Sequence, residues 1–591
     1  MSEKSKSAII VGAGAGGVAL AARLAKAGLR VTVVEKNDHT GGRCSLIHHE
    51  GHRFDQGPSL FLLPRLFHQT FEDLGTTLPA AGVDLLRCQT NYNVYFHDGE
   101  RFQHSSDLAA MRTEMERWEG AGGFERWVAW LREGHRHYEI SVREVLGKNF
   151  VHFWDMVRPS FVATILDMHP FESMWSRAGR YFYTERLRRV FTFATMYMGM
   201  SPFDAPATYS LLQYTEFAEG IWYPKGGFHK VVDALVRIGQ SFGVEYRLST
   251  PVARVLTSPD GKKATGVLLE SGEELSADIV VLNADLVYSY GNLLPRSPAI
   301  ENRTRSLQKK EASCSSISFY WSMKRKIPEL STHNIFLAEE YRESFDAIFD
   351  RHTIPDEPSF YVNVPSRVDP TAAPDGCDSV IVLVPVGHLS RRSKGATPTA
   401  DDHDADAEGL LPTDEQHWDQ IVDRARTAVI SAIEARASCT GLREAIGHEI
   451  VNTPPTWETR FNLDRGAILG LSHNFLNVLW FRPKTRAPEL GATYFVGAST
   501  HPGTGVPIVM AGTRITAEQI LGDLGMAVPW SRRDEKVVQG GKVVSEVMDG
   551  RSDTWLRFGT EEFIVLVLLG TFVLFTAYLL SYVSGPGLVL S

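Results

Sequence analysis

With 591 residues the chain is long enough to bury more than one hydrophobic core, so two or three domains are expected. Hydrophobic residues make up 43% and charged residues 22%, which is ordinary for a globular protein. The net charge of −9 and the lack of a basic stripe with interleaved aromatic residues argue against a nucleic-acid partner. Five scattered cysteines without a C-x-x-C pair argue against a disulfide framework and against a thiolate metal site.

The chain begins with the pattern of a dinucleotide-binding unit. An apolar run is followed by glycines in the spacing G-x-G-x-x-G, at Gly12, Gly14 and Gly17, and then by a small-residue helical pattern. Gly12 permits the tight turn, Gly14 lets the backbone approach a pyrophosphate, and Gly17 lets the helix pack close to the strand. A second apolar strand, residues 31–34, ends on Glu35, where a carboxylate can bind ribose hydroxyls.

A second glycine loop beyond Glu35 distinguishes the possible dinucleotides. It contains Gly42 and Arg43, and Gly57, Pro58 and Ser59 follow a short distance on. These residues resemble the amine-oxidase-like flavoprotein superfamily, in which G-G-R lies along the FAD pyrophosphate. The planar, permanently charged guanidinium suits phosphate oxygens. A plain NAD dehydrogenase has no need of this second loop, and the ordinary alternative is a surface turn with a solvated arginine.

The middle of the chain mixes apolar helical patterns with short strands. Residues 92–102 predict a hairpin with an Asp-Gly turn, and residues 228–241 predict a helix. Residues 380–384 predict a buried strand that Pro385 stops. Large apolar residues are frequent between residues 118 and 168, and most of them are expected in a core. The alternative is a surface that binds an apolar substrate or enters a bilayer.

Asp155 and Arg158 lie three residues apart and are predicted to share one helix face. On this spacing alone, the ordinary interpretation is a surface ion pair that contributes roughly a few tenths of a kcal/mol to stability.

The second informative stretch lies near residue 500. A strand meets a glycine-rich turn that contains Gly497, Gly505, Val506 and Pro507, and a helical pattern follows over residues 508–521. The positive end of that helix dipole suits an electron-rich flavin ring, particularly the negative charge of its reduced form.

Together with residues 222–227 and 313–316, these motifs resemble the bacterial and fungal carotenoid desaturases of the phytoene desaturase family, over about residues 7–521. The resemblance implies FAD as cofactor and a long apolar polyene as substrate. The residues expected to bind the cofactor are Gly12, Gly14, Gly17, Glu35, Gly42, Arg43, Gly57, Pro58, Ser59, Val252, Gly497, Gly505, Val506 and Pro507.

The resemblance also implies an active-site role for the Asp155 and Arg158 pair. We hypothesise that Asp155 takes the proton released from the substrate or stabilises positive charge, and that Arg158 keeps Asp155 ionised. His501 is a second candidate base, although a histidine fixed in a structural turn is the favoured interpretation. A strong base is not obligatory, because conjugation eases a cation-like transition state.

The expected fold class is α/β, a Rossmann-like FAD-binding domain with an inserted mixed α+β substrate domain and a C-terminal transmembrane helix. The FAD-binding domain is expected in three parts, residues 1–60, 221–290 and 484–525. The other regions are an apolar helical region at 61–220 that faces substrate or membrane, a substrate domain at 291–483, a linker at 526–562 and a transmembrane helix at 563–583.

Residues 563–583 carry no charge over about the 20 residues that a helix needs to cross a bilayer. Six lysines and arginines precede this segment and no charged side chain follows it, so the positive-inside bias predicts a cytosolic enzyme with a single C-terminal anchor. Such a tail anchor suggests the endoplasmic reticulum. A buried soluble helix is the alternative.

Phytoene desaturation to lycopene or a further desaturated carotene is therefore the expected activity. A polyene saturase of the same superfamily and a non-catalytic prenyl-binding escort protein are alternatives, and an amine oxidase is less favoured. The residues leave open the number of desaturation steps, the electron acceptor (oxygen or a quinone) and the oligomeric state.

Overall fold

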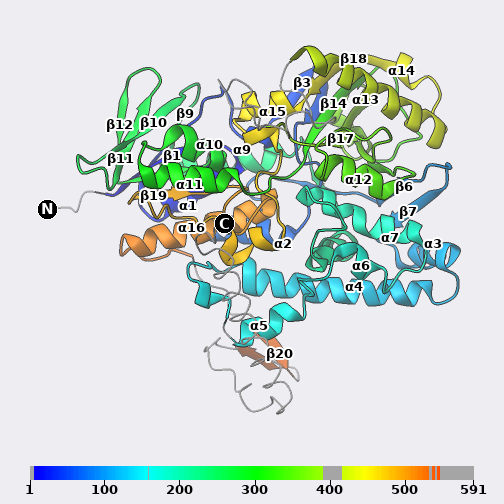
Figure 1. The fold of residues 1–591 in the computed structure, drawn as a ribbon, viewed down its shortest axis with the longest axis horizontal. Helices are drawn as coiled ribbons and strands as arrows, with labels where there is room; N and C mark the ends of the chain where they lie inside the picture. The colour runs from blue at the N-terminus through cyan, green and yellow to red at the C-terminus, as the bar shows by residue number, and fades with distance from the viewer. Residues whose placement is uncertain (1–4, 158, 391–414, 531–535, 540–541, 546–591) are drawn as a thin grey trace, which may run out of the picture. The chain divides into compact units, whose positions relative to one another are not determined.

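The computed structural model describes residues 5–157, 159–390, 415–530, 536–539 and 542–545 (Figure 1). The chain divides into two units, Met1–Pro529 and Trp530–Ser591. In the second unit, β20 (Lys536–Gln539) pairs in antiparallel fashion with β21 (Lys542–Ser545). No helix in the described part of the chain combines the length and apolar character that a membrane crossing needs. The predicted transmembrane helix at 563–583 lies outside the described residues.

A five-stranded parallel sheet forms one part of the first unit, and its strand order is β19-β13-β1-β2-β9. Within it, Ile10 lies opposite Val33 on one side and Val281 on the other. The order places β1 and β2 side by side, between β13 and β9, which come much later in the chain. This arrangement confirms the predicted Rossmann-like core. Its strands are β1 (Ser7–Val11), β2 (Arg30–Val34), β9 (Glu245–Arg247), β13 (Ile279–Leu282) and β19 (Thr493–Phe495).

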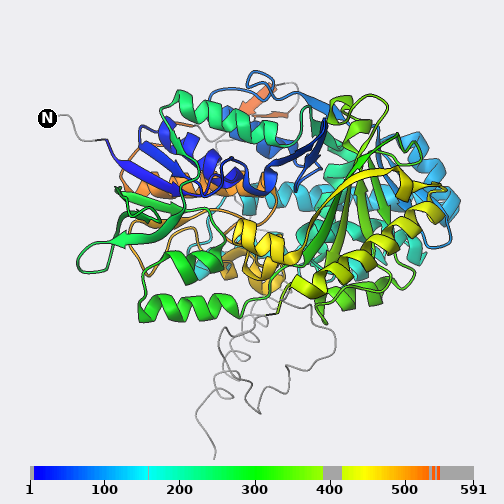
Figure 2. The same ribbon diagram turned by 90° about the horizontal axis from the view of Figure 1, so that it is seen from above.

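Three helices pack around this sheet. The predicted helices form as α1 (Ala15–Lys26), α9 (His229–Ser241) and α16 (Val506–Asp523), and α1 contacts both of the others. Beside them lies an antiparallel sheet of β10 (Val252–Thr257), β11 (Ala264–Leu269) and β12 (Glu274–Ser276). Figures 1 and 2 show these elements at one end of the unit and a larger sheet at the other.

The larger sheet has seven strands in the order β18-β14-β17-β16-β15-β6-β7. It joins the regions 61–220 and 291–483, because the predicted hairpin of β6 and β7 pairs with a strand of the later region. In that pairing β6 runs parallel to β15. The strands are β6 (Thr90–Tyr95), β7 (Arg101–Ser105), β14 (Ser315–Met323), β15 (His333–Phe336), β16 (Phe360–Asn363), β17 (Ser379–Val386) and β18 (Ile446–Asn452).

The prediction that Pro385 stops its strand was wrong, because β17 continues to Val386 and Pro385 pairs with Ser316. On its other side β17 pairs with β16 only at residues 381–383. The missing N–H of Pro385 therefore removes no hydrogen bond between these two strands.

Successive residues of the strands in this sheet enter two different cores. Phe336 and Phe360 pack on the side of α13 (Glu415–Arg436), whereas Ile335 and Tyr361 pack on the side of α3 (Leu108–Glu119) and α4 (Gly123–Ile140). The period of two along each strand explains this division. It leaves a sheet covered on both faces, so many of its side chains are fully buried.

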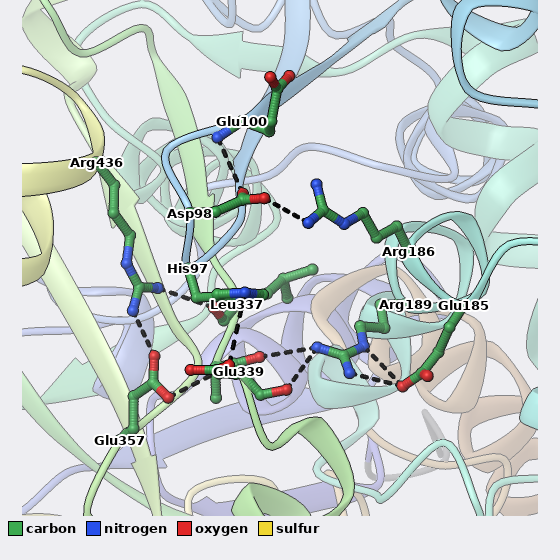
Figure 3. Close-up of polar contacts among 11 residues, drawn as sticks. His97, Asp98, Glu100, Glu185, Arg186, Arg189, Leu337, Glu339, Glu357 and Arg436 are labelled. Atoms are coloured by element: carbon green, nitrogen blue, oxygen red, sulfur yellow. Dashed lines mark hydrogen bonds and ion pairs between the residues drawn. The ribbon is translucent and has the colours of Figure 1, made fainter.

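Two arginines hold the loop after β15 from opposite faces of this sheet, Arg189 on α7 (Glu185–Thr192) and Arg436 on α13 (Figure 3). Arg189 donates to the carbonyl of Glu339 at 2.8 Å and to the carboxylate of Glu185 at 2.6 Å. Arg436, at the end of α13, donates to the carbonyl of Leu337 at 2.8 Å and pairs with Glu357. The helical region is therefore tied to the sheet as well as packed against it.

The remaining elements are short. The helices are α2 (Pro64–Asp73), α5 (Pro159–Leu166), α6 (Met174–Ala178), α7 (Glu185–Thr192), α8 (Leu211–Tyr214), α10 (Leu286–Tyr288), α11 (Pro298–Gln308), α12 (Tyr341–Phe349), α14 (Leu442–Ala445) and α15 (Pro454–Phe461). Two further antiparallel pairs are β3 (Leu46–His49) with β4 (His52–Asp55), and β5 (Leu85–Arg87) with β8 (Trp222–Pro224).

The structure corrects the expected helix around Asp155. Residues Phe153–Asp155 form one short 3₁₀ turn, and α5 begins only at Pro159. A proline disfavours helical backbone at the residue before it, and the Asp155 carboxylate accepts a hydrogen bond from the His152 N–H at 2.9 Å, which closes the turn. Arg158 lies outside the described residues.

Candidate functional site

A cavity of about 850 Å³ lies inside the first unit and is lined by both large sheets and by the helical region. Part of its wall, here named the nucleotide wall, comes from the predicted glycine loops and their neighbours. Thirteen of the fourteen predicted cofactor residues are in that wall. They are Gly12, Gly14, Glu35, Gly42, Arg43, Gly57, Pro58, Ser59, Val252, Gly497, Gly505, Val506 and Pro507.

Gly17 lies behind this wall and acts through packing. A Cβ at Gly17 would lie 2.1 Å from the Gly12 carbonyl oxygen, which no side chain can tolerate. Gly12 itself has φ +103°, a conformation that favours glycine. The close approach at Gly17 and the backbone conformation of Gly12 together bring the N-terminus of α1 against the end of β1, as the spacing predicts.

Two helices point uncapped N-termini toward the cavity. The N-cap residues of α1 and α16 are Gly14 and Gly505, and neither has a side chain to accept hydrogen bonds from the first turn. The free N–H groups and the positive end of each helix dipole favour an anion or an electron-rich group. Both glycines line the cavity.

Two charged residues complete the nucleotide wall. Glu35 is 7% exposed, and its carboxylate accepts hydrogen bonds from the Ala13 N–H at 2.7 Å and the Asn37 N–H at 2.9 Å. Arg43 donates to the Ile468 carbonyl, and within the described residues it forms no ion pair with a carboxylate. A guanidinium held at a cavity wall without such an ion pair suits a phosphate ligand.

Asn283 and Asp285 were missed in the sequence analysis. Asn283 Nδ2 donates to the Gly12 carbonyl at 3.1 Å, and both residues line the cavity. Burial raises the pKa of Asp285 to about 6. Asn283 directly follows β13, which lies beside β1, and Asp285 comes two residues later. Because the carboxyl ends of parallel strands meet at one sheet edge, that position was a signal that could have found them.

The rest of the lining, here named the apolar wall, comes from the helical region, the seven-stranded sheet and the segment before β19. It includes Ile165, Met168, Phe193, Met196, Met198, Leu211, Leu212, Leu383, Leu469, Phe475, Val478 and Leu479. These residues carry no hydrogen-bonding side chain, so they can contact a ligand only through apolar surface. Hydroxyl-bearing side chains lie among them, including Tyr197, Thr208, Tyr209, Ser316, Ser318 and Tyr361. Tyr361 shares hydrogen bonds with Ser59 at 2.9 Å and His333 at 2.7 Å.

His501 does not line the cavity. Its Nε2 lies 2.8 Å from the Lys148 carbonyl, and burial lowers its pKa to about 4. Both features fit a histidine fixed in a turn. His473 does line the cavity, and its Nε2 accepts the Thr504 N–H at 3.0 Å. It thereby holds the glycine-rich turn in front of α16.

Asp155 is also absent from the cavity lining. Its carboxylate closes the turn at His152, and Lys484 lies near enough to interact with it electrostatically. The structure therefore does not bring Asp155 to the cavity wall. An active-site role for Asp155 with Arg158 stays a prediction.

Comparison with known proteins agrees with this geometry. Residues 15–521 match the family described as flavin containing amine oxidoreductase. A phytoene desaturase from Neurospora crassa is 60% identical, and the alignment covers 90% of this chain and 88% of that protein. The chain belongs to the phytoene desaturase family. A phytoene desaturase from Fusarium fujikuroi is 56% identical over 98% of this chain and all of that protein.

The fold is also that of solved flavoenzymes. A structure of putrescine oxidase redesigned in its cofactor binding superimposes with a TM-score of 0.56 at 14% identity, covering 88% of this chain and all of that chain. The predicted cofactor, FAD, fits the nucleotide wall, because two uncapped helix N-termini and Arg43 offer sites for its phosphates and ring. The chain is an FAD-dependent oxidoreductase.

Proposed function

We propose that this protein dehydrogenates phytoene in successive steps, to lycopene or to a further desaturated carotene. The observation that carries the proposal is that one cavity combines the nucleotide wall with the apolar wall. A long polyene has nothing to hydrogen-bond, so its affinity comes from buried CH₂ and CH₃ groups, at about 0.8 kcal/mol each. The relatives of highest identity reported above, which are named phytoene desaturases, support this choice over a saturase or an escort protein.

Bound FAD supplies the acceptor for the hydrogen and electron pair that leave the substrate. The protein's own contribution is binding, orientation and exclusion of water. Leu383 from β17 and Leu212 from α8 are among the side chains that would hold the polyene. Their apolar surroundings would exclude water from the carbons on which positive charge develops.

Absorption spectra of pigments test the proposed activity. The chain would be expressed in cells that make phytoene and no later carotene. Each additional conjugated double bond moves the absorption to longer wavelength, so the peak position counts the desaturation steps. Colourless phytoene beside flavin-loaded protein would contradict the proposed substrate.

We also propose that the bilayer is a partner, because the substrate dissolves there. Exposed apolar side chains lie in the turn before α5, in the loop after α5 and in the segment after His473, and their exposure supports this proposal. Trp154 is 73% exposed, Phe171 75% and Leu476 62%. The Phe171 ring packs at a tilt against the Phe475 ring with a centroid distance of 4.8 Å, and Phe475 lines the cavity. Such a patch beside the apolar wall favours entry of a hydrocarbon directly from lipid.

The proposed location is the endoplasmic reticulum membrane, with residues 563–583 as a single anchor and the enzyme on the cytosolic side. Alkaline carbonate extraction of membranes tests the anchor. The full chain should stay in the membrane pellet, whereas a variant that ends at residue 560 should be released by carbonate yet still bind vesicles. Release of the full chain would contradict the anchor without affecting the proposed activity.

A further inference from the structure

Glu216 is a buried carboxyl group that the proposed function does not use. It belongs to one of the short π-helical segments, Thr215–Glu219, and is 1% exposed. Its carboxylate accepts hydrogen bonds from the Tyr92 hydroxyl at 3.1 Å and from Gln213 Nε2 at 3.0 Å. Among the described residues no lysine or arginine forms an ion pair with it. Burial without a cation raises the pKa of Glu216 to about 8.

Two tyrosines connect Glu216 to the cavity. The Tyr92 and Tyr197 hydroxyls are neighbours that influence each other's pKa, and Tyr197 lines the cavity. Cavity, Tyr197, Tyr92 and Glu216 therefore follow one another without an intervening apolar layer. Tyrosine hydroxyls both donate and accept hydrogen bonds, so they can pass a proton by exchanging bonds.

The other titratable groups around this path are neutral. Tyr361 interacts with both tyrosines, and its own hydroxyl bonds to Ser59 and His333. The His104 and His333 rings lie 5.4 Å and 5.9 Å from the Tyr92 ring. Burial lowers the pKa of His104 well below its usual value and that of His333 to about 3. In the described part of the chain, Glu216 is therefore the group on this path that can gain a charge near neutral pH.

We propose that Glu216 takes up the proton released in each desaturation, through Tyr197 and Tyr92. The proposal rests on the proposed function. In each step one C–H hydrogen leaves the substrate with its electron pair, and the adjacent carbon loses a proton whose electron pair becomes the new double bond. Tyr197 receives this proton while passing its own to Tyr92, and Tyr92 passes one to the Glu216 carboxylate.

The path also balances the second half of the reaction. A two-electron acceptor such as oxygen or a quinone gains two protons when it is reduced. One of these is the hydrogen that left the substrate with its electrons, and the proton stored on Glu216 returns along the same tyrosines as the other. No proton has to reach bulk water, which agrees with the burial of Glu216. Because Glu216 acts through two tyrosines, it is a positioning residue for the proton.

The experiment compares Glu216→Gln with Glu219→Gln as a matched control. Glu219 lies on the same π-helical turn, but its carboxylate bonds to Tyr138 at 2.9 Å and to Thr215 at 2.7 Å, away from the tyrosine path. Flavin-loaded proteins are mixed with phytoene without oxygen, and the bleaching of the flavin is followed in one turnover at several pH values. Tyr197→Phe, which removes the first hydroxyl of the path, is measured beside them.

The wild-type rate should rise as pH passes through the pKa of Glu216, because only the ionised carboxylate accepts a proton. Glu216→Gln and Tyr197→Phe should be slower by roughly 10- to 100-fold and should lose this rise, whereas Glu219→Gln should match the wild type. An infrared titration without substrate gives a second readout. The carbonyl band of a protonated carboxylic acid should disappear near pH 8 in the wild type and in Tyr197→Phe, and should be missing throughout in Glu216→Gln.

The proposal would be overturned if Glu216→Gln had the rate and the pH profile of the wild type. Loss of turnover in Asp155→Asn beside such a wild-type profile in Glu216→Gln would assign the proton to Asp155 instead. If phytoene does not bleach the flavin of the wild-type protein, both the proposed function and this proposal are overturned. The two failures are therefore distinguishable.

Discussion

The two walls of the cavity recognise their ligands in opposite ways. The nucleotide wall works through backbone geometry, as at Gly12 and Gly14, and through two helix N-termini. The apolar wall works through side chains such as Leu212 and Leu383 that come from unrelated elements. A charged dinucleotide needs N–H groups at fixed positions, whereas a hydrocarbon accepts any apolar surface of the right shape.

This difference decides how each wall responds to substitution. A backbone site fails completely when one glycine gains a side chain, because the backbone cannot move away. An apolar surface loses affinity in proportion to the area removed. The following changes test this contrast, in order of expected effect.

Gly17→Ala should have the largest effect. Its Cβ would lie 2.1 Å from the Gly12 carbonyl oxygen, so α1 must shift away from β1. The purified protein should lose bound flavin, which the ratio of flavin to protein absorbance measures. Gly522→Ala, in α16 with no atom within 4 Å of the added carbon, is the control and should keep its flavin. Retained flavin in Gly17→Ala would contradict the backbone account.

Glu216→Gln tests how a buried carboxyl group near the apolar wall makes stability depend on pH. Its pKa is about 8 in the folded protein and near 4.3 in the unfolded chain, so the folded state holds the extra proton between these values. Stability should therefore fall as pH rises from about 4.5 to about 8 and then level off. The amide removes this dependence, and above pH 8 the variant should be more stable by on the order of 3–5 kcal/mol.

Denaturant unfolding at several pH values measures this effect. Glu219→Gln serves again as the control, because its carboxylate keeps two hydroxyl donors. Parallel curves for wild type and Glu216→Gln across this range would show that Glu216 is not protonated in the folded protein.

Leu383→Ala should weaken substrate binding and leave the flavin in place. Three carbons of apolar wall are removed, so the loss should be about 2 kcal/mol, or roughly thirtyfold in kcat/KM. Leu108→Ala, at a side chain that is 62% exposed, should leave kcat/KM unchanged. Loss of flavin from Leu383→Ala would mean that the two walls are not independent.

Asp155→Asn should have the smallest effect. The amide oxygen can still accept the His152 N–H and close the turn, so turnover should stay within about threefold of wild type. Steady-state turnover with confirmed flavin content is the measurement. A drop of a hundredfold or more would instead support the hypothesis that Asp155 takes the proton.

Sequence reasoning predicted the nucleotide wall far better than the rest. Gly12, Gly17 and Glu35 have spacings that the chemistry of a dinucleotide demands, so the pattern is visible in the chain. The apolar wall has no such spacing, and Leu212 or Leu383 looks like any core residue. Asn283 was missed because its role depends on strand order. Glu216 was missed because its burial depends on how the helical region folds onto β6.

Local errors had local physical causes. Pro385 does not end β17, because the lost N–H faces a side where β16 has already ended. The helix expected around Asp155 is replaced by a turn, because a side-chain hydrogen bond to His152 and the following Pro159 compete with it. At Pro385 the extent of the neighbouring strand decided the outcome, whereas at Asp155 a hydrogen bond to His152 and the nearby Pro159 did.

The strand order of the parallel sheet has a consequence for biosynthesis. β1 is made first, yet its sheet is completed by β13 and β19, and the second uncapped helix, α16, ends at Asp523. A ribosome must therefore release nearly the whole enzyme before the flavin can bind. Until then the first glycine loop lacks β13, β19 and α16, and apolar strands stay exposed to aggregation. Chaperone supply during translation, as much as flavin supply, should set how much active enzyme a cell obtains.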